Sequence, residues 1–235
     1  VVGASARSDA RLKFQVVKGE MSYNYDLPGD GTPIIVPINM GDGPYTFRVM
    51  QNTSGNNYVE LFSVIDNVNL SSETAPYLVP NVFVNYNESS AVVAKARELA
   101  QGAANQGDVV RNIYQWVVDN ITYDHDKAAQ LASATGYVPD PDATLAAGTG
   151  ICFDYASLGA AMLRSLGIPC QVITGYVSPD DVYHAWNMVY IDGEWISVEI
   201  SIKPNSWTRV DLTFAASGAA STIGDGTSYT DRYTY

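Results

Sequence analysis

The pattern of apolar and polar residues divides the chain into two parts. Between about Arg11 and Leu70, short stretches alternate apolar with polar residues, which is typical of half-buried β-strands, and Gly, Pro, Asn and Asp separate them. These stretches are Arg11–Val17, Met21–Asp26, Ile34–Ile38, Tyr45–Gln51 and Tyr58–Val64. From Val92 onward, apolar residues recur at helical spacing. The pattern predicts an α+β protein in which a small β-sandwich module precedes a core of helices and strands.

Two helices are predicted at the start of this core. Residues 92–103 and 109–117 both carry apolar residues at helical spacing. Ser89 or Ser90 is the expected N-cap of the first helix, and Asp108 of the second. Their apolar faces are expected to pack against the helix that follows.

A third helix and two strands come next. The helix is predicted from Cys152 to Ser165, ended by Gly167-Ile168-Pro169, and is about 20 Å long. The apolar run Cys170–Val177 predicts a buried strand of about 26 Å that returns along the helix. The next predicted strand, His184–Ile191, therefore begins beside the end of the helix that carries Cys152.

Asp192-Gly193 is a strong hairpin signal after this strand, and it predicts a third strand from Glu194 to Glu199. A two-residue turn would place Trp186 opposite Glu199. Alternation of side chains then puts Glu199 on the same face as His184, as its diagonal neighbour at about 7–8 Å.

These placements bring together three residues with the chemistry of a cysteine acyltransferase. The helix N-terminus at Cys152 favours thiolate over thiol, His184 supplies a base, and Glu199 orients the imidazole. Singly, each residue also has an ordinary explanation as a buried thiol, a core histidine or a solvated carboxylate. Asn187 and Asp181 are alternatives for the third position, whereas Asp192 lies too far along the strand.

Four motifs of this segment resemble those of a known family, the transglutaminase-like superfamily of cysteine acyltransferases and peptidases. The motifs are Gly150-Ile151-Cys152-Phe153-Asp154-Tyr155-Ala156, Gly167-Ile168-Pro169, Thr174-Gly175-Tyr176 and His184-Ala185-Trp186-Asn187. The resemblance covers roughly residues 92–201.

The resemblance implies a papain-like core in which the nucleophile helix packs on an antiparallel sheet. It also implies that Cys152 is the nucleophile, His184 the base and Glu199 the orienting acid. One position departs from the family: Glu199 stands where aspartate is usual, and Ile200 follows it in place of proline.

Several other residues have candidate roles near this site. Trp116, Tyr123 or Tyr155 could supply the second donor of an oxyanion hole, beside the backbone N–H at Cys152. His125 is expected in a solvated loop, with metal or substrate contact as the alternative. No set of ligands with metal spacing is recognisable, so neither a metal nor a cofactor is expected.

Two further features are expected to be structural. Cys170 is predicted to lie at the far end of the helix from Cys152, too distant for a disulfide, and is interpreted as a buried thiol. The run Asp140-Pro141-Asp142-Ala143-Thr144 resembles an aspartyl-phosphate motif, but no apolar strand leads into it. It is interpreted as a loop that enters the nucleophile turn.

The predicted domains are a β-sandwich-like module with its linker in residues 1–80 and a catalytic domain in residues 81–216. Residues 217–235 are expected to form a tail or a late strand docked on the first module. Lys and Arg total 13 against 25 Asp and Glu, a net charge of −12, which argues against nucleic acid and anionic membranes as partners. No apolar stretch is long enough to insert into a membrane.

The expected function is acyl transfer at protein or peptide amides through an acyl-enzyme on Cys152. Hydrolysis, by a peptidase or deamidase, is favoured over cross-linking because no second, amine-binding site can be identified. The alternatives are a protein-glutamine transglutaminase and a non-catalytic binding module built on a retired enzyme fold. The composition and the leading β-module suggest an extracellular or cell-surface protein with cell-wall or extracellular substrates.

Overall fold

The protein is described by a computed structural model that covers residues 1–177, 182–191, 206–210 and 229–235. The chain divides into two compact units, Val1–Pro76 and Tyr77–Tyr235. The boundary falls at the short 3-10 helix η1 (Ala75–Tyr77), where the sequence indicates a linker.

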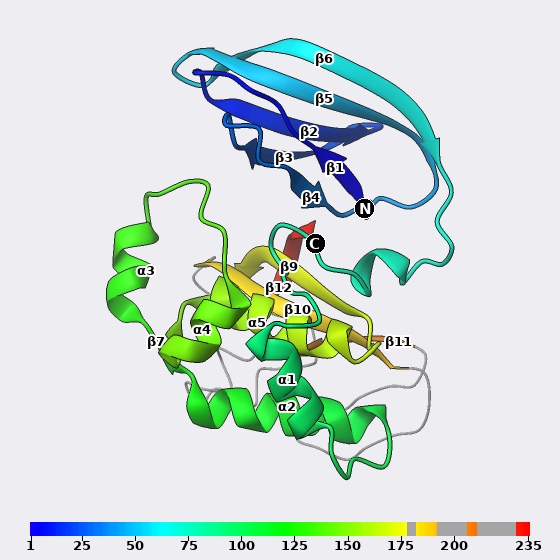
Figure 1. Cartoon of the computed structure of the whole chain (residues 1–235), viewed down its shortest axis with the longest axis vertical. Helices are drawn as coiled ribbons and strands as arrows, with labels where there is room; N and C mark the ends of the chain where they lie inside the picture. The colour runs from blue at the N-terminus through cyan, green and yellow to red at the C-terminus, as the bar shows by residue number, and fades with distance from the viewer. Residues whose placement is uncertain (178–181, 192–205, 211–228) are drawn as a thin grey trace. The chain divides into compact units, whose positions relative to one another are not determined.

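The first unit consists of two antiparallel sheets (Figure 1). The larger sheet has the order β3-β2-β5-β6, with β2 (Leu12–Lys18), β3 (Met21–Leu27), β5 (Gly43–Ser54) and β6 (Asn57–Val68). The smaller sheet pairs β1 (Val2–Ala4) with β4 (Ile34–Val36). Each of the five stretches expected as strands overlaps one of β2 to β6, so the β-rich first module is confirmed.

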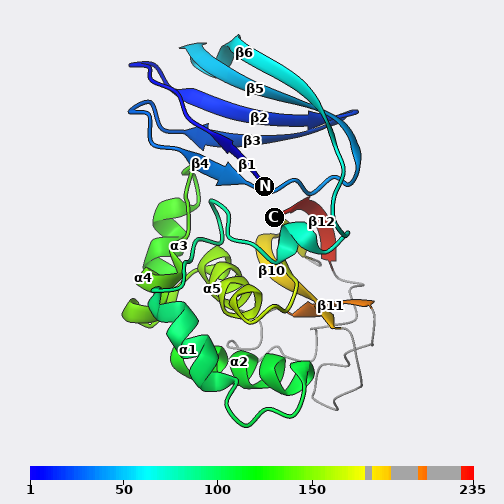
Figure 2. The same ribbon diagram turned by 45° about the vertical axis from the view of Figure 1, so that its right-hand side comes forward.

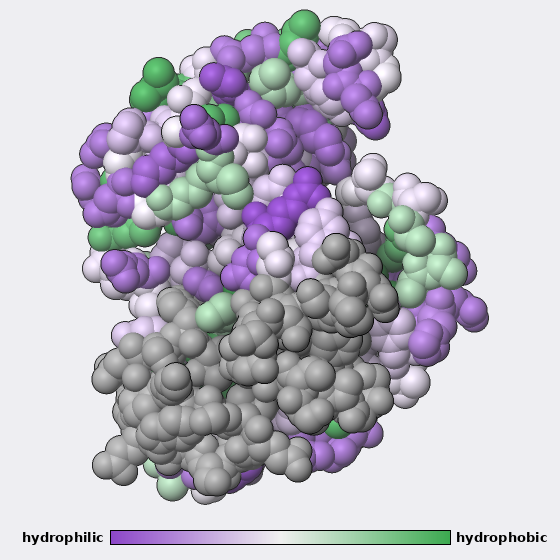
Figure 3. Space-filling model, turned by 180° about the vertical axis from the view of Figure 1, so that it is seen from behind, coloured by the Kyte–Doolittle hydropathy of each residue, from purple (hydrophilic) through white to green (hydrophobic). Residues whose placement is uncertain are grey.

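Burial alternates along β2, β3 and β4, as expected for strands with one covered face. Leu12, Phe14 and Val16 on β2 are buried, and the rings of Phe14 and Phe47 stack at 6.3 Å. β6 differs because its large apolar side chains, among them Phe62, are exposed. Figure 3 shows apolar residues scattered among hydrophilic ones on the surface of this unit.

In its described parts, the second unit contains five α-helices and a four-stranded antiparallel sheet whose strand order differs from the order in the chain. The helices are α1 (Ala91–Leu99), α2 (Gln106–Asn120), α3 (His125–Leu131), α4 (Pro141–Ala147) and α5 (Cys152–Ser165). The sheet has the order β11-β10-β9-β12, with β9 (Cys170–Val177), β10 (Val182–Ile191), β11 (Ser206–Val210) and β12 (Tyr229–Thr234). Two short strands, β7 (Thr122–Tyr123) and β8 (Thr149–Gly150), pair in parallel.

Helix α5 is the centre of this unit. Figures 1 and 2 show it against one face of the β9–β10 sheet, and α1, α2 and α4 also pack on it. Leu158 and Met162 of α5 are fully buried in the same cluster as Val172 of β9 and Val189 of β10. The bounds predicted for α5 and β9 are confirmed, as is the helix-on-sheet core.

The segment expected as a loop at 140–144 is instead the start of α4. Asp140 is the N-cap, and its carboxylate accepts the N–H of Ala143 at 3.0 Å, while Pro141 occupies the first turn. Asp142 accepts the N–H of Val92 at 2.8 Å and so satisfies the N-terminus of α1. Both aspartates therefore serve as helix caps.

The expected start of the second helix was also wrong by three residues. Asn105 caps α2, and its side chain accepts the N–H of Asp108, which occupies the third position of the helix. The carboxylate of Asp108 in turn accepts the N–H of Ala104 at 3.1 Å. Of the two candidates for α1, Ser90 is the N-cap.

The end of the chain forms the strand β12, which pairs with β9 of the second unit. Beyond it, Tyr235 exchanges two backbone hydrogen bonds with Val172, at 2.7 and 2.9 Å. A late strand was one of the two expectations for this segment, but its pairing partner belongs to the core sheet and not to the first module. The free edge of β9 supplies the unpaired backbone groups that such a strand requires.

Candidate active site

Cys152 is the first residue of α5, and two glycines shape the turn that leads the chain to it. Gly148 ends α4 in the left-handed region at φ 65°, which lets the chain turn directly into β8. Gly150 has no room for a side chain, because an added Cβ would lie 2.7 Å from Cβ of Asp154. The loop-to-helix junction predicted at Cys152 is therefore confirmed.

The two cysteines are both free, and their environments differ. Cys152 is half-buried at the helix start, whereas Cys170 is fully buried at the start of β9. Burial raises the pKa of the Cys170 thiol to about 12, although the nearby Arg164 opposes the shift. Cys170 is the inert structural thiol that the sequence indicates.

Iodoacetamide should therefore modify Cys152 in the folded protein and leave Cys170 unmodified. Cys170 should react only after denaturant has exposed it, because the thiolate is the reactive form. Peptide mass spectrometry of native and denatured samples measures both sites. Comparable labelling of the two cysteines in the native protein would contradict this assignment.

Strand β10 runs alongside α5 in the same direction. Near the middle of β10, the Asn187 amide donates to the Ala156 carbonyl at 2.9 Å. Further along, the Tyr190 N–H donates at 3.0 Å to the carbonyl of Pro169, which follows the C-terminal end of α5. The start of β10 consequently lies at the N-terminal end of α5.

This direction places His184 and Cys152 at the same end of the helix–sheet layer. His184 lies about 10 Å before Asn187 along the strand, and Cys152 lies about 6 Å before Ala156 along the helix. His184 is buried, and its ring stacks with that of Trp186, with the ring centroids 6.4 Å apart. The structure thus places Cys152 and His184 at the same end of the helix–sheet layer, with the His184 side chain on the Trp186 face of the sheet, opposite the face that packs on α5.

Asn187 is not the residue that orients the imidazole. Its amide donates to Ala156 and, at 3.0 Å, to the carbonyl of Gln171, and the side chain is buried. Because Asn187 follows His184 by three positions, the two side chains point to opposite faces of the sheet. Asn187 fastens β10 to α5 instead.

The register predicted for the third strand is not the one found on β10. The described partner of Ile191 is Ser206 and that of Asn187 is Val210, so β11 occupies this edge, and β9 occupies the other. Glu199 lies outside the described residues, as do Asp181 and Asp192, and its role stays a prediction.

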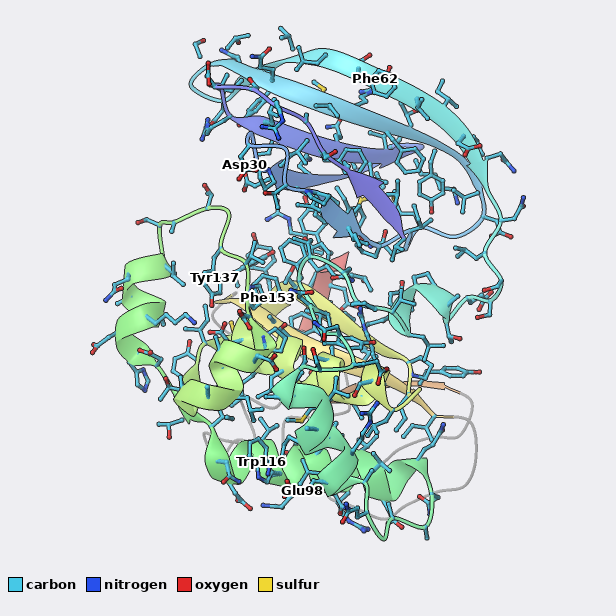
Figure 4. All side chains as sticks on the ribbon, viewed as in Figure 1. Asp30, Phe62, Glu98, Trp116, Tyr137 and Phe153 are labelled. Carbon is cyan, nitrogen blue, oxygen red and sulfur yellow. The ribbon has the colours of Figure 1, made fainter. Side chains whose placement is uncertain are left out.

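Two of the three candidate oxyanion donors are engaged elsewhere. The Tyr155 hydroxyl is fully buried and donates to the Ile121 carbonyl at 2.6 Å. Trp116 lies on α2 under the ammonium group of Lys95, 5.4 Å from the ring centroid. Figure 4 shows Trp116 well away from Phe153, the residue that follows the nucleophile.

Tyr123 is the remaining candidate, and it lies beside the nucleophile. Its strand β7 pairs with β8, in register with Gly150. Burial raises the pKa of the Tyr123 hydroxyl, and the nearby Cys152 and Asp154 side chains add to the shift. The hydroxyl is therefore a protonated donor at neutral pH.

His125 begins α3 next to this position. Its ring is exposed and lies edge-on to Tyr123, with centroids 5.0 Å apart. The solvated loop expected there is a helix start, capped by Asp124. Within the described part of the chain, no group of three His, Cys, Asp or Glu side chains is arranged to hold a metal ion.

An aromatic pair that the sequence analysis missed lies at the start of β10. Tyr183 faces Tyr176 across the strands at 5.3 Å, and Arg232 donates to the Tyr176 hydroxyl at 3.1 Å. Tyr183 shares the α5 face with Asn187 and lies about 13 Å before it, beyond the helix start at Cys152. Tyr183 is half-exposed, so this pair presents an aromatic surface to solvent there.

The sequence analysis also missed a buried carboxylate behind the nucleophile. Asp154 is completely inaccessible and accepts three hydrogen bonds: from the Ile151 N–H at 2.8 Å, from the Lys127 ammonium at 2.6 Å and from the Tyr137 hydroxyl at 2.5 Å. Figure 4 shows Tyr137 close to Phe153 in projection, by the start of α5. The only feature of the sequence that points to Asp154 is its position two residues after Cys152.

Comparison with known proteins gives a family and several distant relatives. The sequence profile of the Transglutaminase-like superfamily matches residues 93–211. Cytokinesis protein 3 of Schizosaccharomyces pombe is 33% identical over 120 residues, which are 45% of this chain and 12% of that protein. The Kyphoscoliosis peptidase of Mus musculus is 31% identical over 112 residues, which are 43% of this chain and 16% of that protein.

Among solved structures, a candidate cysteine protease from Cytophaga hutchinsonii superposes with a TM-score of 0.52 at 16% identity. The superposition covers 99% of this chain and 73% of that one. At this identity the likeness concerns the fold alone.

Proposed function

Because the chain belongs to the transglutaminase-like superfamily, we propose that it transfers acyl groups from protein or peptide amides through a covalent intermediate on Cys152. The observation that supports this proposal is that the backbones of Cys152 and His184 lie at the same end of the helix–sheet layer, at the N-terminal end of α5 and the start of β10. The proposed third member is Glu199.

The helix start supports this role electrostatically. The N-cap of α5 is Ile151, whose side chain cannot accept a hydrogen bond, and the first N–H groups of a helix have no acceptor within it. Their partial positive charge stabilises a thiolate and then the oxyanion of a tetrahedral intermediate. Tyr123 is the proposed second donor to that oxyanion.

The reaction has two chemical steps. The Cys152 thiolate attacks the amide carbonyl carbon, and His184, protonated, gives its proton to the departing amine as the C–N bond breaks. A second nucleophile then adds to the thioester, loses its proton to His184 and displaces the thiolate. Water at this step yields a carboxylic acid, whereas a primary amine yields a new amide.

We favour hydrolysis, and therefore a peptidase or deamidase, over cross-linking. The aromatic surface at Tyr176 and Tyr183 is one proposed wall for the acyl substrate, and no second surface for an amine is evident among the described residues. The proposed setting is extracellular or at a cell surface. No helix in the described part of the chain is long and apolar enough to span a bilayer.

An assay with a glutamine-containing protein and a labelled primary amine tests this choice. We expect product masses that show cleavage or deamidation, with little amine incorporation, and complete loss of both products in Cys152→Ala. Robust amine incorporation would replace the hydrolytic assignment with a transglutaminase. Products that persist in Cys152→Ala would exclude the acyl-enzyme, and absence of any turnover over a broad substrate panel would favour the binding module.

A further inference from the structure

We propose that Lys127 is a positioning residue for the nucleophile, because it neutralises the buried carboxylate of Asp154 and leaves the start of α5 electropositive. This inference rests on the proposed role of Cys152. Three groups define the arrangement, and they come from separate parts of the chain: Asp154 on α5, Lys127 on α3 and Tyr137 in the segment before α4.

The nucleophile turn depends on Asp154. Its carboxylate accepts the N–H of Ile151 at 2.8 Å and so fixes the residue that directly precedes Cys152. Gly150 lies against the same side chain, since only a glycine fits there. Asp154 therefore holds the backbone at the one place where the nucleophile must be precisely oriented.

The charge of Asp154 would, however, oppose the chemistry. A carboxylate two residues from Cys152 disfavours a thiolate and offsets the positive end of the helix dipole. A completely buried carboxylate also requires a partner to remain ionised. Both requirements are met by one cation at 2.6 Å, the ammonium group of Lys127.

The environment of Lys127 keeps it charged. Burial opposes the positive charge, but hydrogen bonds to Asp154 and Tyr137 outweigh burial and raise the pKa of Lys127. The ammonium group also lies over the Tyr137 ring, 4.8 Å from its centroid. Its backbone N–H is held as well, by the N-cap side chain of Asp124 at 2.8 Å. The residue is thus fixed at both ends.

The test measures the rate at which iodoacetamide alkylates Cys152 at about pH 6, where an ordinary cysteine is almost entirely thiol. We expect Lys127→Met to slow alkylation about tenfold, the size of effect that one neighbouring charge has on thiolate formation. Lys127→Met combined with Asp154→Asn removes both charges and should return the rate to within about threefold of the wild type. Asp154→Asn alone should be at least as fast as the wild type.

A matched control is Lys13→Met in the first unit, because Lys13 is similarly accessible and pairs with Asp26 at 2.6 Å. Its alkylation rate should equal that of the wild type. If Lys127 were only structural, Cys152 would be alkylated slowly both in Asp154→Asn and in the double variant, and this result would overturn the inference. An alkylation rate in Lys127→Met equal to that of the wild type would overturn it as well. If Lys127→Met does not fold, the alkylation rate of Asp154→Asn decides alone: a rate at or above that of the wild type supports the inference, and a slower rate overturns it. A wild-type Cys152 no faster than a free cysteine peptide would overturn the proposed function as well.

Discussion

Replacing His184 with alanine should reduce amide turnover by about 10²–10⁴-fold, the range that a positioned acid–base group contributes. The same variant should slow alkylation of Cys152 at about pH 6, because the imidazolium that stabilises the thiolate is lost. The geometric basis is the direction of β10, which the contacts of Asn187 and Tyr190 with α5 and Pro169 establish. Initial rates with the substrate found for the wild type, together with labelling rates, measure both effects.

The chain offers a control for this prediction in its other histidine. His125 is exposed at the start of α3, and His125→Ala should keep turnover within about threefold of the wild type. Residues that act as one unit have non-additive effects, so Cys152→Ala combined with His184→Ala should be no less active than Cys152→Ala alone. Equal turnover in His184→Ala and the wild type would contradict the role of His184.

The elements predicted best are those whose boundaries have local causes. Helix α5 was predicted from Cys152 to Ser165 because a glycine-rich loop leads into it and Gly167-Ile168-Pro169 cannot continue a helix. Strand β9 follows as a short, mostly apolar segment. In both cases the residues that determine the element lie inside it or next to it.

Strand pairing between distant segments was not predictable in the same way. The Asp192-Gly193 signal indicates a turn, but it cannot show which later strand occupies the edge of β10. That partner is β11, which begins at Ser206, and β12 comes from the end of the chain to pair with β9. The position inferred for Glu199 depended on the two-residue turn.

The candidate site was predictable where chemistry and direction agree. The roles of Cys152 and His184 were predicted from their residue types, from the length of the helix and from the strand that runs back along it. None of these requires knowledge of side-chain contacts. Side-chain contacts were needed to exclude Tyr155 and Asn187, since each has the right chemistry but donates to a backbone carbonyl. The pairing of Lys127 with Asp154 spans 27 positions and has no periodic signal.

Arg164 is another residue whose role only the structure shows. It is buried at the end of α5, and its guanidinium donates to three backbone carbonyls: Cys170 at 2.8 Å, Val79 at 2.9 Å and Tyr235 at 2.7 Å. Burial lowers the pKa of Arg164 to about 10, while Cys170 and Tyr86 partly oppose the shift, so the group remains charged at neutral pH. One side chain thus joins α5 to the start of β9, to the segment before α1 and to the end of the chain.

Replacing Arg164 with methionine should lower the free energy of unfolding of the second unit by about 3 kcal/mol or more. Each buried carbonyl left without a donor costs about 1–3 kcal/mol, and three are affected. Removing a buried charge returns part of this cost, which is why the expected loss is taken from the low end of that sum. Denaturant unfolding measures the change, and amide hydrogen exchange should show the largest loss of protection at Val172 and Tyr235.

Arg97→Met is the control for this prediction, because Arg97 is exposed on α1 and its ion pair is with the exposed Glu88. Its free energy of unfolding should change by less than about 0.5 kcal/mol. If Arg164→Met were as mild, water would have to reach all three carbonyls, and Arg164 would not anchor the end of the chain. A large loss with unchanged exchange at Tyr235 would instead confine its role to the junction between α5 and β9. If Arg164→Met causes both a large loss of unfolding free energy and faster amide exchange at Tyr235, then Arg164 fastens the end of the chain, and with it β12, to the sheet that carries His184.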